Sequence, residues 1–419
     1  MNSHLIFSML VCITAISAYL NNRYFKLPKT IALTIISVLI SIIVTQLIKL
    51  YPNIILPIHT LLSSVNFRIT VLEVMLGYLL FAGALHINSI ELRKNVLSVI
   101  YLASIGVIIS TVLTGCILYY FSNIFNFNLS LADCLIFGAI ISPTDPIAVM
   151  SFFRNTKKSL THIKVKIIGE ALFNDAVSIL LLVILVGVLY NKDYANFSID
   201  NISLNLAQEV FGGIIWGVFL GYTSSYFLSK TNDNEASILI TIAVASAGYV
   251  IASYLHISGP ITMVISGLLI GSYSKKQKFS IKTTESLNQF WSLVDGILNA
   301  FLFVLLGLEL LTININLSSF FISMVGLVVI FIARFISILI PNIFKFKHVT
   351  KPNNFLIMWK ENFILWWGGV RGAISIALAL ATPGLPPYLI GITYLIVIMS
   401  ILLQGSTLKF IMDKLFSSP

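Results

Sequence analysis

The most telling shortage in this sequence is charge. Only 10% of its 419 residues are Asp, Glu, Lys or Arg, whereas 58% are hydrophobic. Soluble domains average about 25% charged residues, so the composition excludes an ordinary soluble protein. The polar stretches are at most roughly 15 to 20 residues long, too short to bury a core of their own. We therefore expect an integral membrane protein without a soluble regulatory domain.

Cysteine is also scarce, and Cys12, Cys116 and Cys134 all lie in apolar runs. That placement suits packing better than a disulfide framework or a metal cluster. The first apolar stretch has no basic residue ahead of it and no Ala-x-Ala cleavage site after it, so we expect a retained span rather than a signal peptide. We expect no cofactor and no enzymatic activity.

Apolar runs long enough to cross a bilayer follow one another along the chain; a crossing helix needs about 20 residues. They predict an all-α polytopic membrane protein with about thirteen transmembrane helices. The expected spans are 5–20, 31–48, 69–87, 96–121, 131–153, 165–190, 207–229, 236–255, 258–273, 291–311, 318–341, 364–381 and 388–411.

Basic residues are unevenly shared among the loops that join these spans. Of the 26 Lys and Arg residues, 21 lie in one alternating set of loops, three lie in the other set, and Arg334 and Arg371 lie within spans. The positive-inside rule predicts an external N-terminus and a cytoplasmic C-terminus in the cell membrane. This alternation also argues against nucleic acid as the partner of a chain whose net charge is +10.

A few ionisable residues stand inside the expected spans. A charge at the bilayer centre costs roughly 2.5 to 3.5 kcal/mol on insertion scales, which makes such residues functional candidates. Structural ion pairs that fix helix packing are the alternative, and it stays open for one acid and one base, Glu170 and Arg334. The candidates singled out are the acids Glu73, Asp145, Glu170 and Asp175 and the bases Arg334 and Arg371.

Two expected spans are interrupted. Thr144 and Asp145 stand between two prolines in "ISPTDP", and proline removes a backbone donor and clashes with the preceding turn. Three glycines surround Arg371 in "GGVRGAIS", and glycine loosens a helix. Half-helix ends carry partial charges, so Asp145 can neutralise an N-terminus and Arg371 a C-terminus. A simple proline kink is the alternative for the first interruption.

The positions of the two interruptions suggest an internal repeat. Repeat one would cover about 5–190 and repeat two about 236–411, with a linking helix at about 207–229. Each interruption then falls in the fifth span of its repeat. Interrupted helices at matching places in two halves point to the binding site of a transporter.

Five segments occur in an order that resembles the NhaP-type sodium/proton antiporters of the monovalent cation/proton antiporter-1 family. The resemblance covers the whole chain. It implies inverted six-helix repeats, broken helices that cross at spans five and twelve, and a homodimer in the lipid membrane. The segments are "ISPTDP", "GEALFND", "FLFVLLGLEL", "IARFIS" and "GGVRGAIS".

The resemblance also assigns residues to the ion site. Asp175 matches the acid that binds the cation, Na⁺ or Li⁺, and the proton, and Asn174 matches its amide partner. Thr144 and Asp145 match the interruption in span five. Glu73 matches an acid that some relatives bring to the ion. The stoichiometry would change if Glu73 or Asp145 also titrates.

The resemblance also bears on packing and ion preference. Glu170 and Arg334 match a pair that holds the core together. Many relatives have a serine after this glutamate, where the chain has Ala171. A hydroxyl ligand is therefore missing, which leaves the preference between Na⁺ and K⁺ open.

The neighbouring residues Asn174 and Asp175 suggest a mechanism. A deprotonated carboxylate is a hard oxygen ligand for a small cation, whereas a protonated one offers no charge. Because Asn174 replaces a possible second acid, we expect electroneutral exchange of one cation for one proton. Glu170 and Asn174 share a helix face, and Asp175 is turned about 100° from Asn174.

Two other classes of function fit the sequence less well. A passive cation channel normally uses rings of charge or carbonyl filters, and no filter-like repeat occurs in the sequence. An intramembrane aspartyl protease would need two acids such as Asp145 and Asp175, but the GxGD element is absent, as are HExxH and GxSxG.

Overall fold

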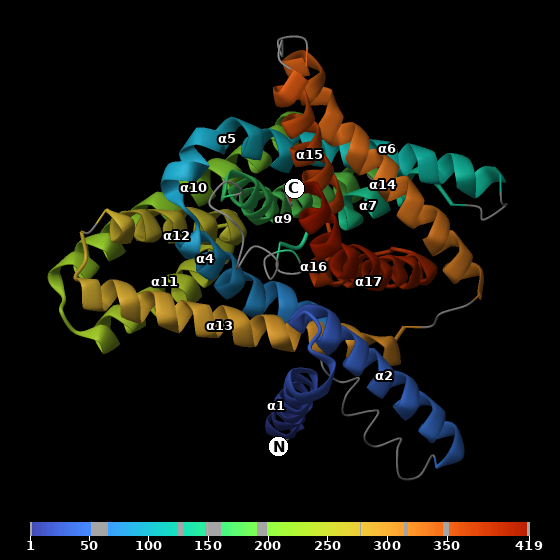
Figure 1. Cartoon of the computed structure of the whole chain (residues 1–419), viewed down its shortest axis with the longest axis horizontal. Coiled ribbons are helices and arrows are strands. Elements are labelled where there is room, and N and C mark those ends of the chain that lie inside the picture. Colours follow the sequence, from blue (N-terminus) through green and yellow to red (C-terminus); the bar gives the residue numbers. More distant parts are fainter. Residues whose placement is uncertain are drawn as a thin grey trace. The chain divides into compact units, whose positions relative to one another are not determined.

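The computed structural model describes residues 2–51, 66–124, 129–146, 149, 161–190, 199–276, 278–313, 317–346 and 352–416. All the regular elements within these ranges are helical (Figure 1). Within the same ranges, nine helical segments are long and apolar enough to cross a membrane. The expected all-α membrane architecture is thus confirmed, while the count of thirteen spans stays a prediction.

The helices include two π-helical stretches, η1 and η2, and one 3-10 turn, η6. In chain order the elements are α1 (Asn2–Leu20), η1 (Asn21–Phe25), α2 (Lys29–Leu50), η2 (Ile69–Met75), α4 (Leu76–His86), α5 (Ser89–Ala103), α6 (Ile105–Ile124), α7 (Leu131–Ile141), α9 (Thr161–Tyr190), α10 (Ile199–Lys230), α11 (Asn234–Tyr254), α12 (Gly259–Lys275), α13 (Ile281–Leu308), η6 (Glu309–Leu311), α14 (Leu317–Phe346), α15 (Pro352–Trp367), α16 (Ala373–Ala381) and α17 (Pro387–Phe416).

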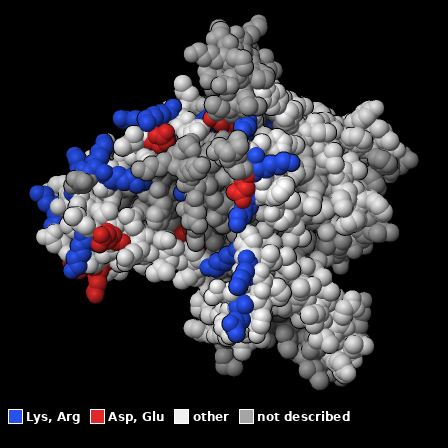
Figure 2. Space-filling view, in the orientation of Figure 1, with Lys and Arg blue, Asp and Glu red and all other residues white. Residues whose placement is uncertain are grey.

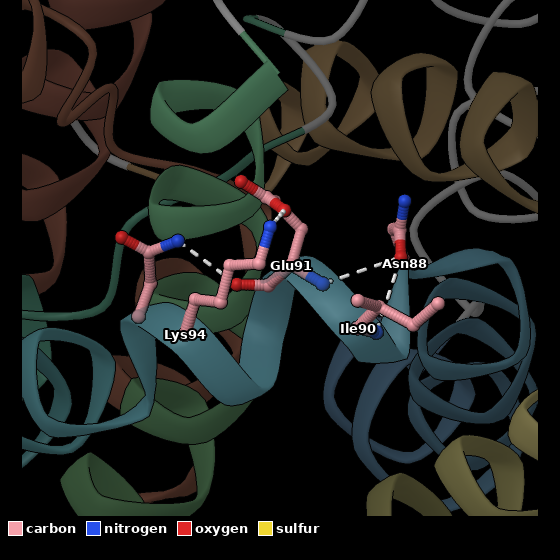
Figure 3. A network of polar contacts seen from close by, with 5 residues as sticks. Asn88, Ile90, Glu91 and Lys94 are labelled. Atoms are coloured by element: carbon pink, nitrogen blue, oxygen red, sulfur yellow. Dashed lines mark hydrogen bonds and ion pairs between the residues drawn. The ribbon is translucent and has the colours of Figure 1, made fainter.

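The start of α5 shows how capping extends a helix beyond its apolar core. The expected span begins at residue 96, but α5 already begins at Ser89. The Asn88 side-chain oxygen accepts hydrogen bonds from the backbone of Ile90 at 3.1 Å and of Glu91 at 3.3 Å (Figure 3). Lys94 pairs with Glu91 at 3.0 Å, one turn further along. These polar contacts satisfy the first-turn donors, so hydrophobicity alone places the start too late.

The chain forms two compact units. Unit 1 comprises residues 1–71, 108–157 and 299–419, and unit 2 comprises residues 72–107 and 158–298. Each unit takes segments from both expected repeats. The repeats therefore do not coincide with the compact units, and they stay a prediction.

In unit 2, small residues let α12 pack closely against two neighbours. A Cβ atom added at Gly217 of α10 would lie 2.9 Å from the Thr262 carbonyl oxygen of α12. A Cβ atom at Gly271 of α12 would overlap the Leu85 carbonyl oxygen of α4. Such contacts leave room for glycine alone, as in other membrane helix pairs that approach through small residues.

In unit 1, hydroxyl groups connect α2 to α13. Ser37 donates to the Phe303 carbonyl at 3.3 Å, and Ser41 donates to the Gly307 carbonyl at 2.9 Å. Both serines are fully buried. Hydrogen bonds of this kind join helices inside a membrane, where packing against lipid supplies little driving force.

The surface of α10 fits a lipid environment. The exposed side chains on it include a stripe at helical spacing, formed by Phe211, Ile215, Phe219, Tyr222 and Tyr226. On the face drawn in Figure 2, the charged side chains gather on the left and in a central column, and the broad described surface on the right shows no charge. A helix that exposes such an apolar face suits a membrane span better than water.

Candidate functional site

The residues with the clearest functional signal lie on α9, in unit 2. This helix runs without interruption from Thr161 to Tyr190. Glu170, Asn174 and Asp175 are all buried on it, with exposed fractions of 1%, 0% and 4%. Because the helix is intact, its backbone ladder needs no help from these side chains. Their polar groups are therefore not required as helix caps.

Tight apolar packing surrounds this part of α9. On the α4 side, a Cβ atom at Gly83 would lie 3.1 Å from a Leu172 methyl carbon. Next to Asp175, Ala176 and Leu180 form a buried cluster with Ile261 of α12. Asp175 is thus a buried acid on a helix whose neighbouring residues pack against apolar side chains, and charge interacts more strongly in such a buried site than in water.

The first interruption follows α7 in unit 1. A capping box made by Ser130 and Asp133 begins α7, which ends at Ile141. The following residues are not helical, and Thr144 and Asp145 are buried there, with exposed fractions of 5% and 7%. The interruption predicted from the prolines is confirmed. The rest of the expected span, apart from residue 149, lies outside the described residues.

The second interruption, also in unit 1, separates α15 from α16. Helix α15 ends at Trp367 and α16 begins at Ala373, with Gly372 as its N-terminal cap. Arg371 stands in the interruption and is buried, with an exposed fraction of 2%. The glycine-rich segment thus interrupts the expected span 364–381 at Arg371, the one basic residue of that span.

The two interruptions lie against each other. The Asp145 backbone N–H donates to the Val370 carbonyl at 2.7 Å. In return, the Arg371 guanidinium donates to the Ser142 carbonyl and, at 3.3 Å, to the Pro143 carbonyl. These carbonyls follow the last turn of α7, where the partial charge is negative and acceptors lack helical partners.

The Asp145 side chain meets the opposite kind of helix end. A Cβ atom at Gly372 would lie 2.8 Å from Asp145 Oδ2 and 2.5 Å from its Cβ atom. The carboxyl group therefore packs directly on the N-terminal cap of α16, where the partial charge is positive. Only glycine leaves room for this approach.

Arg334 of α14 lies at a third helix end. Its Nη2 donates to the Leu365 carbonyl, in the last turn of α15, at 3.3 Å. A Cβ atom at Gly369 would lie 2.9 Å from Arg334 Nε. Arg334 belongs to unit 1, whereas Glu170 belongs to unit 2, so the Glu170–Arg334 pair stays a prediction.

Two further acids complete the set of candidates. Glu73 lies in the π-helical stretch η2, and its side chain is outside the described part of the structure. Glu309 is a buried acid that the sequence analysis missed, although the expected span 291–311 contains it. Its carboxylate accepts a hydrogen bond from the Thr312 hydroxyl at 2.7 Å. Checking every acid inside each expected span would have found it.

Among the described residues, no group of three His, Cys, Asp or Glu side chains is placed to hold a metal ion. Membrane-length helices, a buried Asn–Asp pair and two interrupted helices that meet define a multi-pass membrane protein of the transporter class. Residues 9–414 match the family described as "Sodium/hydrogen exchanger, transmembrane". The chain belongs to this family, as the resemblance implied.

Relatives and a solved structure agree with this assignment. The Na⁺/H⁺ antiporter NhaP of Pseudomonas aeruginosa is 32% identical over 97% of this chain and 96% of its own length. ApNhaP of Aphanothece halophytica, also a Na⁺/H⁺ antiporter, is 31% identical over 93% of this chain and 70% of its own. The sodium proton antiporter MjNhaP1 of Methanocaldococcus jannaschii matches all of both chains with a TM-score of 0.74 at 18% identity, which shows a shared fold.

Proposed function

We propose that this protein is a secondary active antiporter that exchanges Na⁺, and Li⁺ where present, for H⁺ by alternating access. The observation that carries the proposal is the buried Asn174–Asp175 pair on the intact helix α9, in a chain of the sodium/hydrogen exchanger family. The relatives named as Na⁺/H⁺ antiporters support the choice of ions.

Competition at Asp175 is the proposed mechanism. Deprotonated, its carboxylate offers hard oxygen ligands to a small cation, and Asn174 contributes an amide oxygen beside it. Protonated, the same group has no charge to offer, so cation and proton exclude each other. The apparent KM for the cation should therefore rise as the pH falls, while the maximal rate varies much less.

Electroneutral exchange of one cation for one proton follows from Asn174. An acid at this position would let the pair carry a second proton, whereas an amide does not titrate. Exchange should then be indifferent to an imposed membrane potential at fixed ion gradients. A clear stimulation by voltage would refute this ratio and make Glu73 the first residue to test.

The interrupted helices are proposed to support the ion site. Thr144 and Asp145 would line the ion path, and Asp145 would also offset the N-terminal charge of α16. Arg371 would offset the C-terminal charge of α7. The contacts between the two interruptions support these roles, because each charge lies at a helix end of opposite sign.

We also propose a homodimer in the lipid bilayer, with the N-terminus outside and the C-terminus in the cytoplasm. The distribution of loop charges supports this orientation. An impermeant thiol reagent applied from outside should not label Lys158→Cys, which is in a loop expected to face the cytoplasm. Labelling from outside would overturn the orientation.

The test of function is proton flux in proteoliposomes, followed with a pH-sensitive dye while Na⁺, Li⁺ and K⁺ are added in turn. Na⁺ should drive protons in the opposite direction, and empty liposomes provide the control. Dissipation of a sodium gradient without counter-movement of protons would indicate a channel. A response to K⁺ alone would indicate potassium/proton exchange.

A further inference from the structure

One face of α17 carries polar side chains that point to the interruption between α15 and α16. Ser400 and Gln404 are fully buried there, and the Ser400 hydroxyl donates to the Gln404 side-chain oxygen. In the same face, Thr407 accepts a hydrogen bond at 2.9 Å from the indole N–H of Trp367, the last residue of α15. All of these residues belong to unit 1.

Ser400 and Gln404 each bind one backbone group of the interruption. The Arg371 N–H donates to Ser400 Oγ at 2.9 Å. The Gln404 side-chain amide donates to the Trp367 carbonyl at 2.9 Å. In an uninterrupted α-helix, these two backbone groups would bond directly, because an N–H pairs with the carbonyl four residues earlier. The two side chains therefore replace the missing rung between Trp367 and Arg371.

The order of donors and acceptors makes this replacement specific. The Arg371 N–H donates to the Ser400 hydroxyl, and this hydroxyl donates to the Gln404 side-chain oxygen. The Gln404 side-chain NH₂ in turn donates to the Trp367 carbonyl. Serine and glutamine each supply a donor and an acceptor, which the bridge requires of both members. A glutamate at 404 would place an acceptor against the Trp367 carbonyl, and an alanine at 400 would leave the Arg371 N–H without its partner.

The bridge ends at the residues that hold the other interruption. Arg371 reaches the carbonyls of Ser142 and Pro143 beyond α7, and Val370 accepts from the Asp145 N–H. A shift of the backbone at 370–371 would therefore move the guanidinium and the backbone of Asp145 together. We propose that Ser400 and Gln404 are positioning residues, which bridge the missing helix rung and so fix Arg371 and Asp145 where the interrupted helices meet.

A purely structural role would predict something different. Buried hydroxyls in membrane helices often bond to their own helix and stabilise packing, as Thr393 of α17 does with the Leu389 carbonyl at 2.8 Å. Loss of such a bond lowers the amount of folded protein and the maximal rate, but it leaves the apparent KM unchanged. Thr393→Val is therefore the matched control for Ser400→Ala, because both remove one buried hydroxyl from α17.

The experiment has two measurements, of which the second rests on the proposed function. Hydrogen–deuterium exchange of purified protein should be faster in peptides that cover the Arg371 amide in Ser400→Ala and in Gln404→Leu, but not in Thr393→Val. In proteoliposomes, the apparent KM for Na⁺ should rise about fivefold in both variants, the scale expected for one lost hydrogen bond. The Ser400→Ala/Gln404→Leu double variant should match the single variants, because both belong to one bridge.

The outcomes separate the two proposals. If wild-type protein moves no protons in response to Na⁺, the proposed function fails, while deuterium exchange still tests the bridge. If wild type exchanges ions but both variants match Thr393→Val in KM and in deuterium exchange at 371, the positioning role is wrong. An additive double variant would mean that Ser400 and Gln404 act separately.

Discussion

The intact helix α9 and the meeting point of the two interrupted helices both bury charge, but they use it differently. At the interruptions, each charged side chain lies at the end of a helix: Asp145 at α16, Arg371 beyond α7 and Arg334 at α15. On α9, Asp175 extends from a helix whose backbone bonds are already complete. The buried charges at the interruptions thus offset helix ends, a task that Asp175 on the intact helix α9 does not have.

This difference sorts the acids by their expected role. Neutralising Asp145 removes a charge from a helix end, so structure and transport should suffer together. Neutralising Asp175 removes no helix cap, so transport should fail by itself. The comparison therefore predicts that neutralising Asp145 impairs both folding and transport, whereas neutralising Asp175 impairs transport alone.

The largest expected effect is that of Asp175→Asn. The amide keeps the shape of the side chain but removes both its charge and its titration. Exchange in proteoliposomes should vanish at every pH, while expression and the thermal unfolding temperature stay near those of wild type. Asp175→Glu keeps the chemistry and should retain weak activity with an altered KM for the cation. Near wild-type exchange by Asp175→Asn would move the ion site to Glu73 or Asp145.

The predicted Glu170–Arg334 pair is expected to matter for stability more than for transport. Removing one partner of a buried ion pair typically costs about 3–5 kcal/mol, because the other charge remains unpaired. Glu170→Gln and Arg334→Ala should each lower expression and the thermal unfolding temperature. The double variant should cost less than the sum of the two, since coupled residues are not additive. Additive losses would show that the two residues are not paired.

Gly372→Ala tests the contact between the interrupted helices with a single methyl group. The added Cβ atom would lie 2.5 Å from Asp145 Cβ, so the two segments must separate. We expect a loss of roughly 1–3 kcal/mol of stability, the usual result of overpacking. Gly296→Ala in α13 is the control, because nothing lies within 4 Å of a Cβ atom there. Equal unfolding temperatures for both variants would contradict the close contact.

The sequence predicts local structure most directly where a residue type has few structural roles. Paired prolines around Asp145 and glycines around Arg371 predict interruptions, because each disturbs a helix locally. The bridge through Ser400 and Gln404 could not be predicted in this way. Serine and glutamine are common in helices, and their partners lie 29 and 37 residues earlier in the chain, so only packing shows what they bind. Glu309 lies between these two cases, because the sequence predicts the span that contains it but only the structure shows that it is buried.

The smallest expected effect concerns a pair of basic residues that bind helix ends, one in each unit. Arg371 donates to carbonyls beyond α7, and Lys275 donates to the His86 carbonyl at 3.1 Å and to the Ile87 carbonyl, at the end of α4. Arginine keeps its charge at any ordinary pH, whereas lysine can lose it. Burial lowers the pKa of Lys275, just past the expected span 258–273, from 10.5 to about 8.

The sign of the resulting pH dependence follows from proton binding. Between about pH 8 and 10.5, the unfolded chain keeps the Lys275 proton and the folded chain loses it, so the free energy of unfolding rises with pH. Lys275→Arg removes this titration. Wild type should therefore gain thermal stability relative to Lys275→Arg as the pH is raised from 8 to 10, with a constant difference below pH 8. Parallel curves for wild type and Lys275→Arg would show that Lys275 keeps its proton, as Arg371 does.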